Sequence, residues 1–364
     1  MGVPFGPARA LADQTVGFVY VLIPPRVGGV GGHLGARMKS AFFSALVLTT
    51  LPIVPPALAS PSAGASGLEP APSRKAVLVT GASSGIGHRI ARTLADNGYY
   101  VYAGARKAAD IAALSTHAQM EGIRLDVTRP DEITAAVEHI ERAGRGLYGL
   151  VNNAGVFLYD PLIEVSESDM DFITDVNVMG PYRVTKAFAP LLIKSRGRVT
   201  TIGSVAGLFS GRLFGPYGMT KHAVEAYSEA LSQEMAKFGV EVSIIEPGNF
   251  RSKIMRNMAL RLELIDRGES KTQYRDEIER MATFVKTDRS HHADPLPVAR
   301  AVLNFLTVPR PKFRYLVTPN KKESDYAIKR SLQKVVELNQ GHPYRMNNAE
   351  LLELLEGLVE ASGE

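Results

Sequence analysis

Tyr217 and Lys221 lie four residues apart in the segment YGMTK (217–221), and Ser204 precedes the tyrosine by thirteen residues. On a helix, residues four apart project from the same face, so the Lys221 ammonium could stabilise the phenolate and lower the pKa of Tyr217. A phenol tuned in this way can donate and accept the proton of a carbonyl/alcohol interconversion. Ordinary amphipathic helices share this spacing, so the pair indicates chemistry only together with other motifs.

A glycine-rich turn, TGASSGIG, occupies residues 80–87. It follows an apolar run (76–79) that predicts a strand, and it precedes a helical pattern that ends at Asn97-Gly98. A strand, a glycine turn and a helix N-terminus in this order form a cradle for phosphates, because glycine permits close backbone approach and the helix dipole favours negative charge. The turn therefore predicts a dinucleotide site.

Strand-like and helical segments alternate over residues 75–320. The predicted strands are 76–80, 100–104, 122–126, 148–152, 197–203, 240–246 and 313–317, and the longest predicted helices are 168–194 and 217–238. This alternation predicts an α/β fold, a Rossmann-type doubly wound parallel sheet in a single domain. The carboxyl ends of its strands would bring Gly81, Asn153, Ser204 and Pro247 to one edge.

These motifs resemble the classical branch of the short-chain dehydrogenase/reductase family over about residues 75–318. The glycine turn has the spacing TGxxxGxG of that branch. Leu125-Asp126-Val127 resembles the adenine-contacting strand end, and Asn152-Asn153-Ala154-Gly155 resembles the motif that supports the sheet. Asn177-Val178-Met179-Gly180 resembles the segment with the fourth catalytic position, and Pro247-Gly248 resembles the nicotinamide turn.

The resemblance implies an enzyme with four catalytic residues, Asn177, Ser204, Tyr217 and Lys221. Tyr217 would be the general acid/base and Ser204 a donor to the reacting oxygen. Lys221 would bind the nicotinamide ribose, and Asn177 would hold a water that connects Lys221 to solvent. The implied cofactor contacts are Thr80, Gly81, Ser83, Ser84, Gly85, Ile86, Gly87, Arg106, Asp126, Val127, Asn153, Ala154, Gly155, Tyr217, Lys221, Pro247, Gly248, Phe250 and Ser252.

The end of the second predicted strand indicates which nicotinamide cofactor is bound. An NAD enzyme usually has an acidic residue there for the ribose hydroxyls, which neither Gly104 nor Ala105 can replace. Arg106 offers a planar fork suited to a 2′-phosphate, with Lys107 next to it. These residues favour NADP(H) over NAD(H), although Ser84 stands where many NADP enzymes of the family carry Arg or Lys.

The sequence indicates the substrate only by class. The stretches 246–250 and 313–315 resemble the branch of retinol, 17β-hydroxysteroid and 3-hydroxybutyrate dehydrogenases, and residues 249–293 would form a lid. Leu208, Phe209, Leu213 and Phe214 would form an apolar pocket wall, which favours a hydrophobic alcohol or ketone. The alternative function is a catalytically silent nucleotide-binding sensor or scaffold, which would have no need of all four catalytic residues.

The two ends of the chain differ from the domain. Residues 1–37 are expected to be an unstructured Gly/Pro-rich leader, which a start of translation at Met38 would leave out. Residues 38–59 have the form of a secretory signal, and 60–74 are a linker. Three alternatives are open: the segment is cleaved and the protein exported, the apolar segment associates with a membrane, or it is a disordered leader on a cytoplasmic enzyme. The need for a supply of cofactor favours membrane association or a cytoplasmic enzyme over export. Residues 321–364 form a C-terminal helical extension, whose acidic flanks favour docking to protein over an anionic membrane.

Composition excludes several classes of function. The 364 residues include no cysteine, which excludes disulfides, thiolate catalysis and cysteine-ligated metal, and scattered histidines predict no metal site. A net charge of +5 is small for this length and gives no argument for nucleic acid. The partners expected are a small alcohol or carbonyl and further copies of the chain. In similar proteins the two long helices form a dimer interface, and here they carry Ala187, Leu191, Leu192, Ala223, Ala226, Leu231 and Met235.

Overall fold

The computed structural model describes residues 74–252, 263, 265–268, 271–286 and 293–363. The predicted leader, the signal-like segment and nearly all of the linker lie outside the described residues, as does much of the predicted lid. The fold is therefore that of the predicted dehydrogenase domain and the C-terminal extension.

Seven parallel strands form one sheet in the order β3-β2-β1-β4-β5-β6-β7. The strands are β1 (Ala76–Val79), β2 (Tyr100–Ala105), β3 (Met120–Arg124), β4 (Gly149–Asn152), β5 (Arg198–Ile202), β6 (Glu241–Pro247) and β7 (Arg314–Val317). The doubly wound parallel fold is confirmed. β3 begins two residues before the prediction, so Leu125 and Asp126 lie beyond its carboxyl end.

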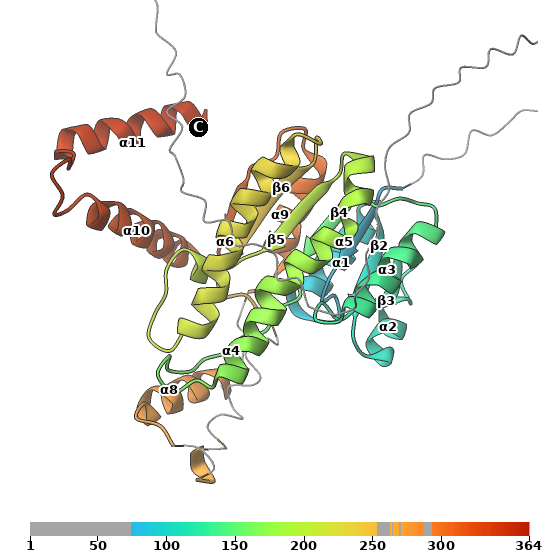
Figure 1. The fold of residues 1–364 in the computed structure, drawn as a ribbon, viewed down its shortest axis with the longest axis horizontal. Coiled ribbons are helices and arrows are strands. Elements are labelled where there is room, and N and C mark those ends of the chain that lie inside the picture. Colours follow the sequence, from blue (N-terminus) through green and yellow to red (C-terminus); the bar gives the residue numbers. More distant parts are fainter. Residues whose placement is uncertain (1–73, 253–262, 264, 269–270, 287–292, 364) are drawn as a thin grey trace, which may run out of the picture. The chain divides into compact units, whose positions relative to one another are not determined.

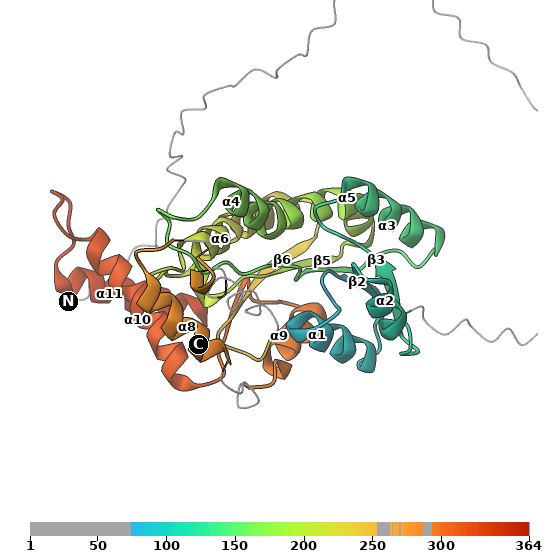
Figure 2. The ribbon, with the colours of Figure 1, turned by 90° about the horizontal axis from the view of Figure 1, so that it is seen from below.

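Helices cover both faces of the sheet (Figures 1 and 2): α3, α5 and α6 lie on one face, and α1 and α9 on the other. The helices are α1 (Gly85–Asp96), α2 (Ala108–Leu114), α3 (Pro130–Arg142), α4 (Glu167–Thr174), α5 (Gly180–Ser195), α6 (Gly215–Ala236), α8 (Arg275–Lys286), α9 (Leu296–Thr307), α10 (Lys321–Leu338) and α11 (Asn348–Ser362). Each face buries its own apolar layer, one with Ile90, Leu94 and Phe305, the other with Phe188 and Leu192. Strands buried on both faces are typical of parallel sheets.

The predicted long helix over 168–194 is interrupted. α4 ends at Thr174, a π-helical turn spans Asp175–Met179, and α5 begins at Gly180. A Cβ atom on Gly180 would lie 2.7 Å from Val127, so glycine allows α5 to approach the end of β3. π-helical turns of this kind often mark functional sites, and this one carries Asn177.

Most of the apolar residues predicted on α5 and α6 pack against the sheet of the same chain. Leu192 and Met235 are buried in the layer between these helices and the sheet, and Ala187, Leu191 and Leu231 pack against it. Ala226 of α6 is exposed, so packing within the chain does not account for the whole stripe, and the dimer interface that the resemblance implies remains a prediction.

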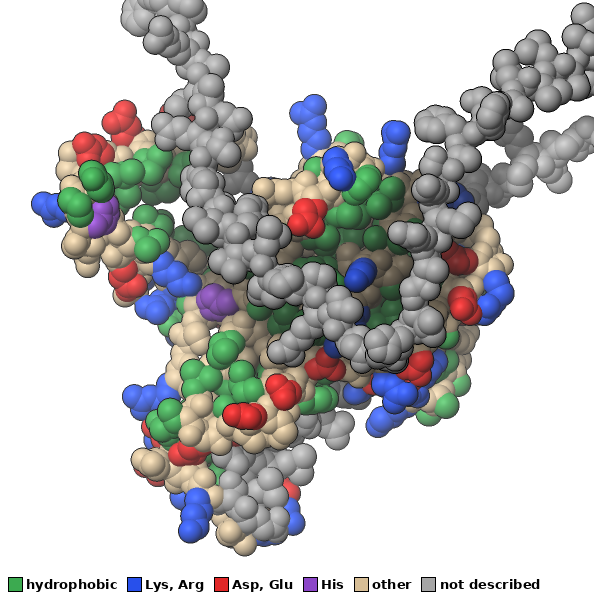
Figure 3. All heavy atoms as spheres, in the orientation of Figure 1, with side chains coloured by type: hydrophobic (Ala, Val, Ile, Leu, Met, Phe, Trp, Pro, Cys, Tyr) green, Lys and Arg blue, Asp and Glu red, His purple; other side chains and the backbone are tan. Residues whose placement is uncertain are grey.

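The C-terminal helices have much less buried surface than the sheet domain. α10 buries Ala327, whereas α11 buries no residue and begins with a capping box formed by Asn347 and Glu350. Figure 3 shows hydrophobic side chains exposed along both helices, among them Leu332 and Leu358. In the described part of the chain, no helix combines the length and apolar character needed to span a membrane.

Candidate active site

A cavity of about 740 Å³ opens at the carboxyl edge of the sheet. The glycine turn after β1 and the ends of β2 and β4 form one end of the cavity, while the Ser204 turn, α6 and single residues of α8 and α10 form the other. With the exception of Thr80, every predicted cofactor residue lines it. Of the four predicted catalytic residues, Ser204, Tyr217 and Lys221 line it and Asn177 does not.

The Asn153 side chain fixes the glycine turn. Its Nδ2 donates to the carbonyl oxygens of Thr80, at 2.9 Å, and Gly81, at 3.1 Å. Gly81 has a φ of +65°, which glycine adopts without strain. A Cβ atom on Gly87 would lie 2.5 Å from the Gly81 carbonyl oxygen and would overlap the Asn153 amide. The spacing of the glycines therefore brings the turn against the end of β4.

Thr80 supports the site from behind the cavity. Its hydroxyl oxygen accepts hydrogen bonds from the backbone N–H groups of Asn153 and Ala154, both at 3.0 Å. Nearby, the buried Asn152 donates to the Thr185 hydroxyl at 2.9 Å, as expected for a motif that supports the sheet. Thr80 thus positions cofactor residues and lies outside the cavity lining.

The N-terminus of α1 fits a bound pyrophosphate. Ser84 stands at the N-cap without making a side-chain capping hydrogen bond, and Ser83 to Gly87 line the cavity. The first N–H groups of a helix need external partners, and phosphate oxygens satisfy them in dinucleotide sites. The residues present therefore match the chemistry of the predicted dinucleotide.

Two arginines meet at the carboxyl ends of β2 and β3. The Arg106 guanidinium is 62% exposed and lies 3.9 Å from the Asp126 carboxylate. Arg124, opposite Ala105 in the register of β3 on β2, donates to the Arg106 carbonyl oxygen. The sequence analysis missed Arg124, because the importance of this residue follows from strand pairing.

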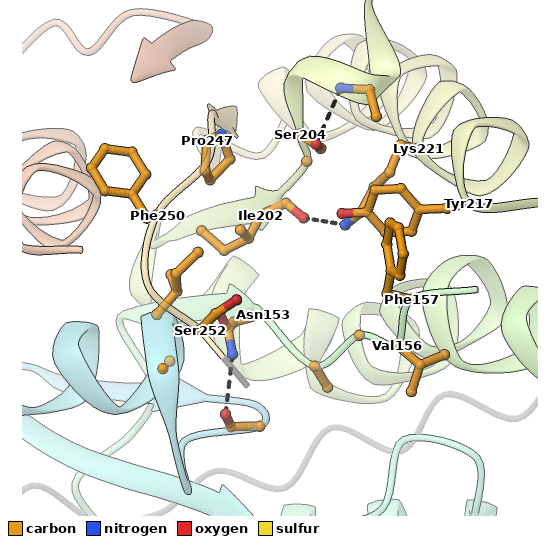
Figure 4. A pocket seen from close by; sticks show the side chains of 18 of the residues that line it. Asn153, Val156, Phe157, Ile202, Ser204, Tyr217, Lys221, Pro247, Phe250 and Ser252 are labelled. Carbon is orange, nitrogen blue, oxygen red and sulfur yellow. Dashed lines mark hydrogen bonds between the residues drawn. The ribbon is translucent and has the colours of Figure 1, made fainter. Parts of the chain in front are cut away.

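The catalytic pair faces the cavity from α6 (Figure 4). Tyr217 and Lys221 are buried, with exposed fractions of 9% and 7%. The Lys221 Nζ donates to the Ile202 carbonyl oxygen at 2.8 Å and lies 5.6 Å from the centroid of the Tyr217 ring. Ser204 follows β5, and its Oγ accepts from the Ala206 N–H at 3.1 Å. The predicted tyrosine, lysine and serine are thus brought together.

Burial shifts both groups toward their neutral forms. Burial raises the pKa of Tyr217 to about 12, and the hydrogen bond with Ser204 acts in the opposite direction. Burial lowers the pKa of Lys221 to about 8, with the charge of Glu225 opposing it. The expectation that Lys221 lowers the pKa of Tyr217 is not met, because the ammonium is bonded to Ile202 and desolvation dominates.

Asn177 connects two elements behind the tyrosine. Its Oδ1 accepts from the Val156 N–H at 2.8 Å, and its Nδ2 donates to the Val156 carbonyl at 2.9 Å and to the Thr220 hydroxyl at 3.0 Å. The Thr220 hydroxyl in turn donates to the Tyr217 carbonyl at 2.8 Å. Asn177 therefore ties the loop after β4 to the catalytic helix, and its predicted role of holding a water remains a prediction.

The other end of the cavity is apolar. Among its lining residues, Phe209 and Phe214 were predicted, whereas Phe157, Met281 and Tyr326 were not. Leu208 and Leu213 are absent from the lining, and Leu213 packs instead with Ile265 and Ile278.

Tyr326 belongs to the C-terminal extension, and its ring meets that of Phe209 edge to face at 5.1 Å. The extension therefore contributes to the cavity wall. The described residues contain no group of three His, Asp or Glu side chains that could hold a metal ion.

Comparison with known proteins agrees with this arrangement. The short chain dehydrogenase family matches residues 75–262. Bovine mitochondrial D-beta-hydroxybutyrate dehydrogenase is 35% identical over 66% of this chain and 76% of its own length. Mouse retinol dehydrogenase 7 is 41% identical over 50% of this chain and 58% of its own length.

Comparison with solved structures also finds short-chain dehydrogenases. A short-chain dehydrogenase from Streptomyces avermitilis superposes with a TM-score of 0.63 at 27% identity, over 74% of this chain and 96% of its own. Other solved short-chain dehydrogenases of this fold contain NAD or NADP. The chain belongs to the classical short-chain dehydrogenase/reductase family, in the branch of the hydroxybutyrate and retinol dehydrogenases, and is an oxidoreductase acting on CH–OH groups.

Proposed function

We propose that the protein is an NADP(H)-dependent oxidoreductase that interconverts a secondary alcohol and a carbonyl on an apolar substrate. The observation that carries the proposal is the meeting of Ser204, Tyr217 and Lys221 at the boundary between the dinucleotide end and the apolar end of one cavity. A hydride donor held at one end and a carbonyl held at the other would meet at these side chains.

The bound nicotinamide supplies or accepts the hydride. In the reductive direction Tyr217 donates its proton to the developing alkoxide, since the raised pKa keeps the phenol protonated at neutral pH. Ser204 donates a second hydrogen bond to the same oxygen and stabilises the charge as it forms. The Lys221 ammonium lies beside the Tyr217 ring, where it would hold the nicotinamide ribose. In the oxidative direction the phenolate takes the proton back.

The preference for NADP(H) rests on the two arginines at the ends of β2 and β3. Arg106 lines the cavity with an exposed side chain, and planar guanidinium groups bind phosphate in a bidentate manner. Arg124 supports it by donating to the Arg106 carbonyl oxygen, while its guanidinium also pairs with Glu132 at 2.8 Å. Asp126 beside Arg106 opposes this preference in part, because a carboxylate suits the free ribose hydroxyls of NAD.

The apolar substrate rests on the lining of the far end. Val156, Phe157, Phe209, Phe214 and Met281 provide aliphatic and aromatic surface, with Tyr326 at its edge. Among the described lining residues, Lys221 is the cation nearest this end, and its Nζ is bonded to Ile202. This lining resembles what a retinoid or a steroid requires more than what a small hydroxy acid with a free carboxylate requires.

The test is consumption of NADPH and NADH by the purified full chain over a panel of retinoid, steroid, aliphatic and keto-acid carbonyls. Tyr217→Phe should lower kcat by roughly 10²–10⁴-fold and leave the Kd of NADPH unchanged. Tyr227→Phe is the matched control, because Tyr227 lies on the same helix and bonds the Pro181 carbonyl at 3.3 Å. Wild-type rates in the Tyr217→Phe variant would refute the mechanism.

A further inference from the structure

The catalytic face of α6 continues away from the cavity. Tyr217, Lys221, Glu225 and Glu229 follow one another at four-residue intervals, so they lie along one side of the helix. Lys221 and Glu225 are both buried. A buried carboxylate one turn beyond the catalytic lysine has no place in the mechanism above.

Glu225 occupies the space beneath the turn that carries Ser204. Gly203 and Gly207 flank this serine on either side. A Cβ atom on Gly203 would lie 3.2 Å from the Glu225 Oε1, and one on Gly207 would lie 2.8 Å from the same atom. Both glycines therefore leave room for the carboxyl group, which supports the Ser204 turn from below.

Two stretches far apart in sequence complete this cluster. Glu246, fully buried, directly precedes the Pro247-Gly248 turn. Arg314 of β7 lies opposite Ile244 in the sheet register, two residues from Glu246, and its guanidinium pairs with both Glu225 and Glu246. It also pairs with Glu229 at 2.9 Å. Arg314 thus links the catalytic helix to the strand that carries the nicotinamide turn.

The two buried carboxyl groups, Glu225 and Glu246, can carry two negative charges, whereas Arg314 supplies one positive charge. Burial, and then the neighbouring Glu225, raise the pKa of Glu246 to about 7, against the attraction of Arg314. Among the described residues, neither the Glu225 Oε1 nor the Glu246 Oε2 has a hydrogen-bond donor, although the two side chains are in contact. The Arg314 guanidinium is thus the cation that both carboxyl groups share.

We propose that Glu225, Glu246 and Arg314 are positioning residues of the active site: the cluster holds the Ser204 and Pro247-Gly248 turns in place, and Glu225 keeps Lys221 in its ammonium form. The inference rests on the proposed function for the roles of Ser204 and Lys221. The charged groups that face Glu225 are Lys221 and Glu229 on α6, Glu246 on β6 and Arg314 on β7, while the turn 203–207 contains none.

The direct test measures the titration of Lys221 without requiring turnover. The full chain is labelled with lysine carrying ¹³C at Cε, and the Lys221 signal is assigned by its loss in Lys221→Arg. We expect Glu225→Gln to move the Lys221 midpoint to lower pH. The control Glu229→Gln, which also loses a contact with Arg314 but at a side chain that is 55% exposed, should leave the midpoint in place. An unchanged midpoint in folded Glu225→Gln overturns the proposal.

A second variant separates charge from position, and it serves if Glu225→Gln does not fold. Glu225→Asp keeps the charge but withdraws the carboxylate from the Ser204 turn by one methylene. We expect the Lys221 midpoint to stay close to that of the wild type, while kcat falls on the order of tenfold through misplacement of Ser204, with the KM for NADPH unchanged. A wild-type kcat, or a midpoint displaced as in the Gln variant, contradicts the proposal.

The two proposals can fail separately. If the wild-type chain turns over no carbonyl on the panel, the proposed function fails, and the Lys221 titration of Glu225→Gln and Glu225→Asp still decides the role of the cluster. If turnover is present and the midpoint does not respond to Glu225, the function stands and the positioning role is lost.

Discussion

The two ends of the cavity are built from different parts of the chain. The dinucleotide end is made largely of backbone in short turns, which local contacts such as those of Asn153 with Thr80 and Gly81 hold in place. The substrate end is made of side chains from α6, α8, α10 and the loops between, and residues as distant as Phe209 and Tyr326 meet there.

This difference means that the two ends tolerate change differently. A backbone turn packed against a strand leaves no free volume, so one added methyl group forces the backbone to move. In a wall made of side chains, single residues can be substituted so that the shape of the cavity changes while the fold stays nearly the same. We therefore expect cofactor binding to be lost abruptly and substrate preference to be altered gradually.

The largest effect is expected from Gly87→Ala. The added methyl group would overlap the Asn153 amide and lie 2.5 Å from the Gly81 carbonyl oxygen, so the turn must move. The free energy of unfolding should fall by about 1–3 kcal/mol, and NADPH binding, followed by its fluorescence, should become undetectable. Gly357→Ala, at a position with nothing within 4 Å, is the matched control. Normal NADPH affinity in Gly87→Ala would show that the turn is not tightly packed.

Arg106→Gln should have a smaller and more selective effect. Loss of a charged contact with the 2′-phosphate should raise the Kd of NADPH by about 10- to 100-fold and leave that of NADH unchanged. Isothermal titration with both cofactors measures the difference. Arg142→Gln, which removes a similarly exposed guanidinium at the last residue of α3, provides the control. Equal weakening of both cofactors would contradict a 2′-phosphate contact.

Tyr326→Leu examines the substrate end. Tyr326 lines the cavity beside Phe209, and an aromatic contact with a bound substrate is worth about 0.5–1.5 kcal/mol, so the KM for bulky apolar substrates should rise by roughly 2- to 10-fold. The Kd of NADPH should not change. Tyr344→Leu alters a tyrosine that is 88% exposed and should change neither quantity. A raised NADPH Kd in Tyr326→Leu would mean that the two ends are coupled.

The smallest effect is expected from removal of residues 340–364. α11 buries no residue, and Tyr326 and Ala327 belong to α10, so the melting temperature should stay within about 2 °C of the intact chain. Thermal unfolding followed by circular dichroism provides the measurement. A fall beyond that range would reveal contacts of α11 that stabilise the domain.

All but one of the cofactor residues predicted from the sequence line the cavity, since each turn is encoded by neighbouring residues. Tyr217, Lys221 and Ser204 were found for the same reason, because four residues along a helix define a face. Arg124, Met281 and Tyr326 were missed because their positions follow from strand register and from the packing of distant helices. The Tyr217 pKa was predicted in the wrong direction, since spacing gives proximity but not burial.

Glu246 and Arg314 show most clearly what could not be predicted from the sequence. Both lie in stretches that the sequence analysis had noted for their resemblance to one branch of the family, but their pairing spans 68 residues. Only the parallel pairing of β6 with β7 brings them together. A single sequence can name both residues without indicating that they meet.

The position of β7 at the edge of the sheet also has a consequence for biosynthesis. A chain on the ribosome that has reached residue 313 already contains the glycine turn, Ser204, Tyr217 and Lys221, but Glu225 and Glu246 still lack Arg314. Two carboxylates facing each other without a guanidinium oppose burial. We therefore expect α6 to pack stably on the sheet only after β7 has emerged from the ribosome. Chains that terminate before β7 should be inactive and sensitive to proteolysis.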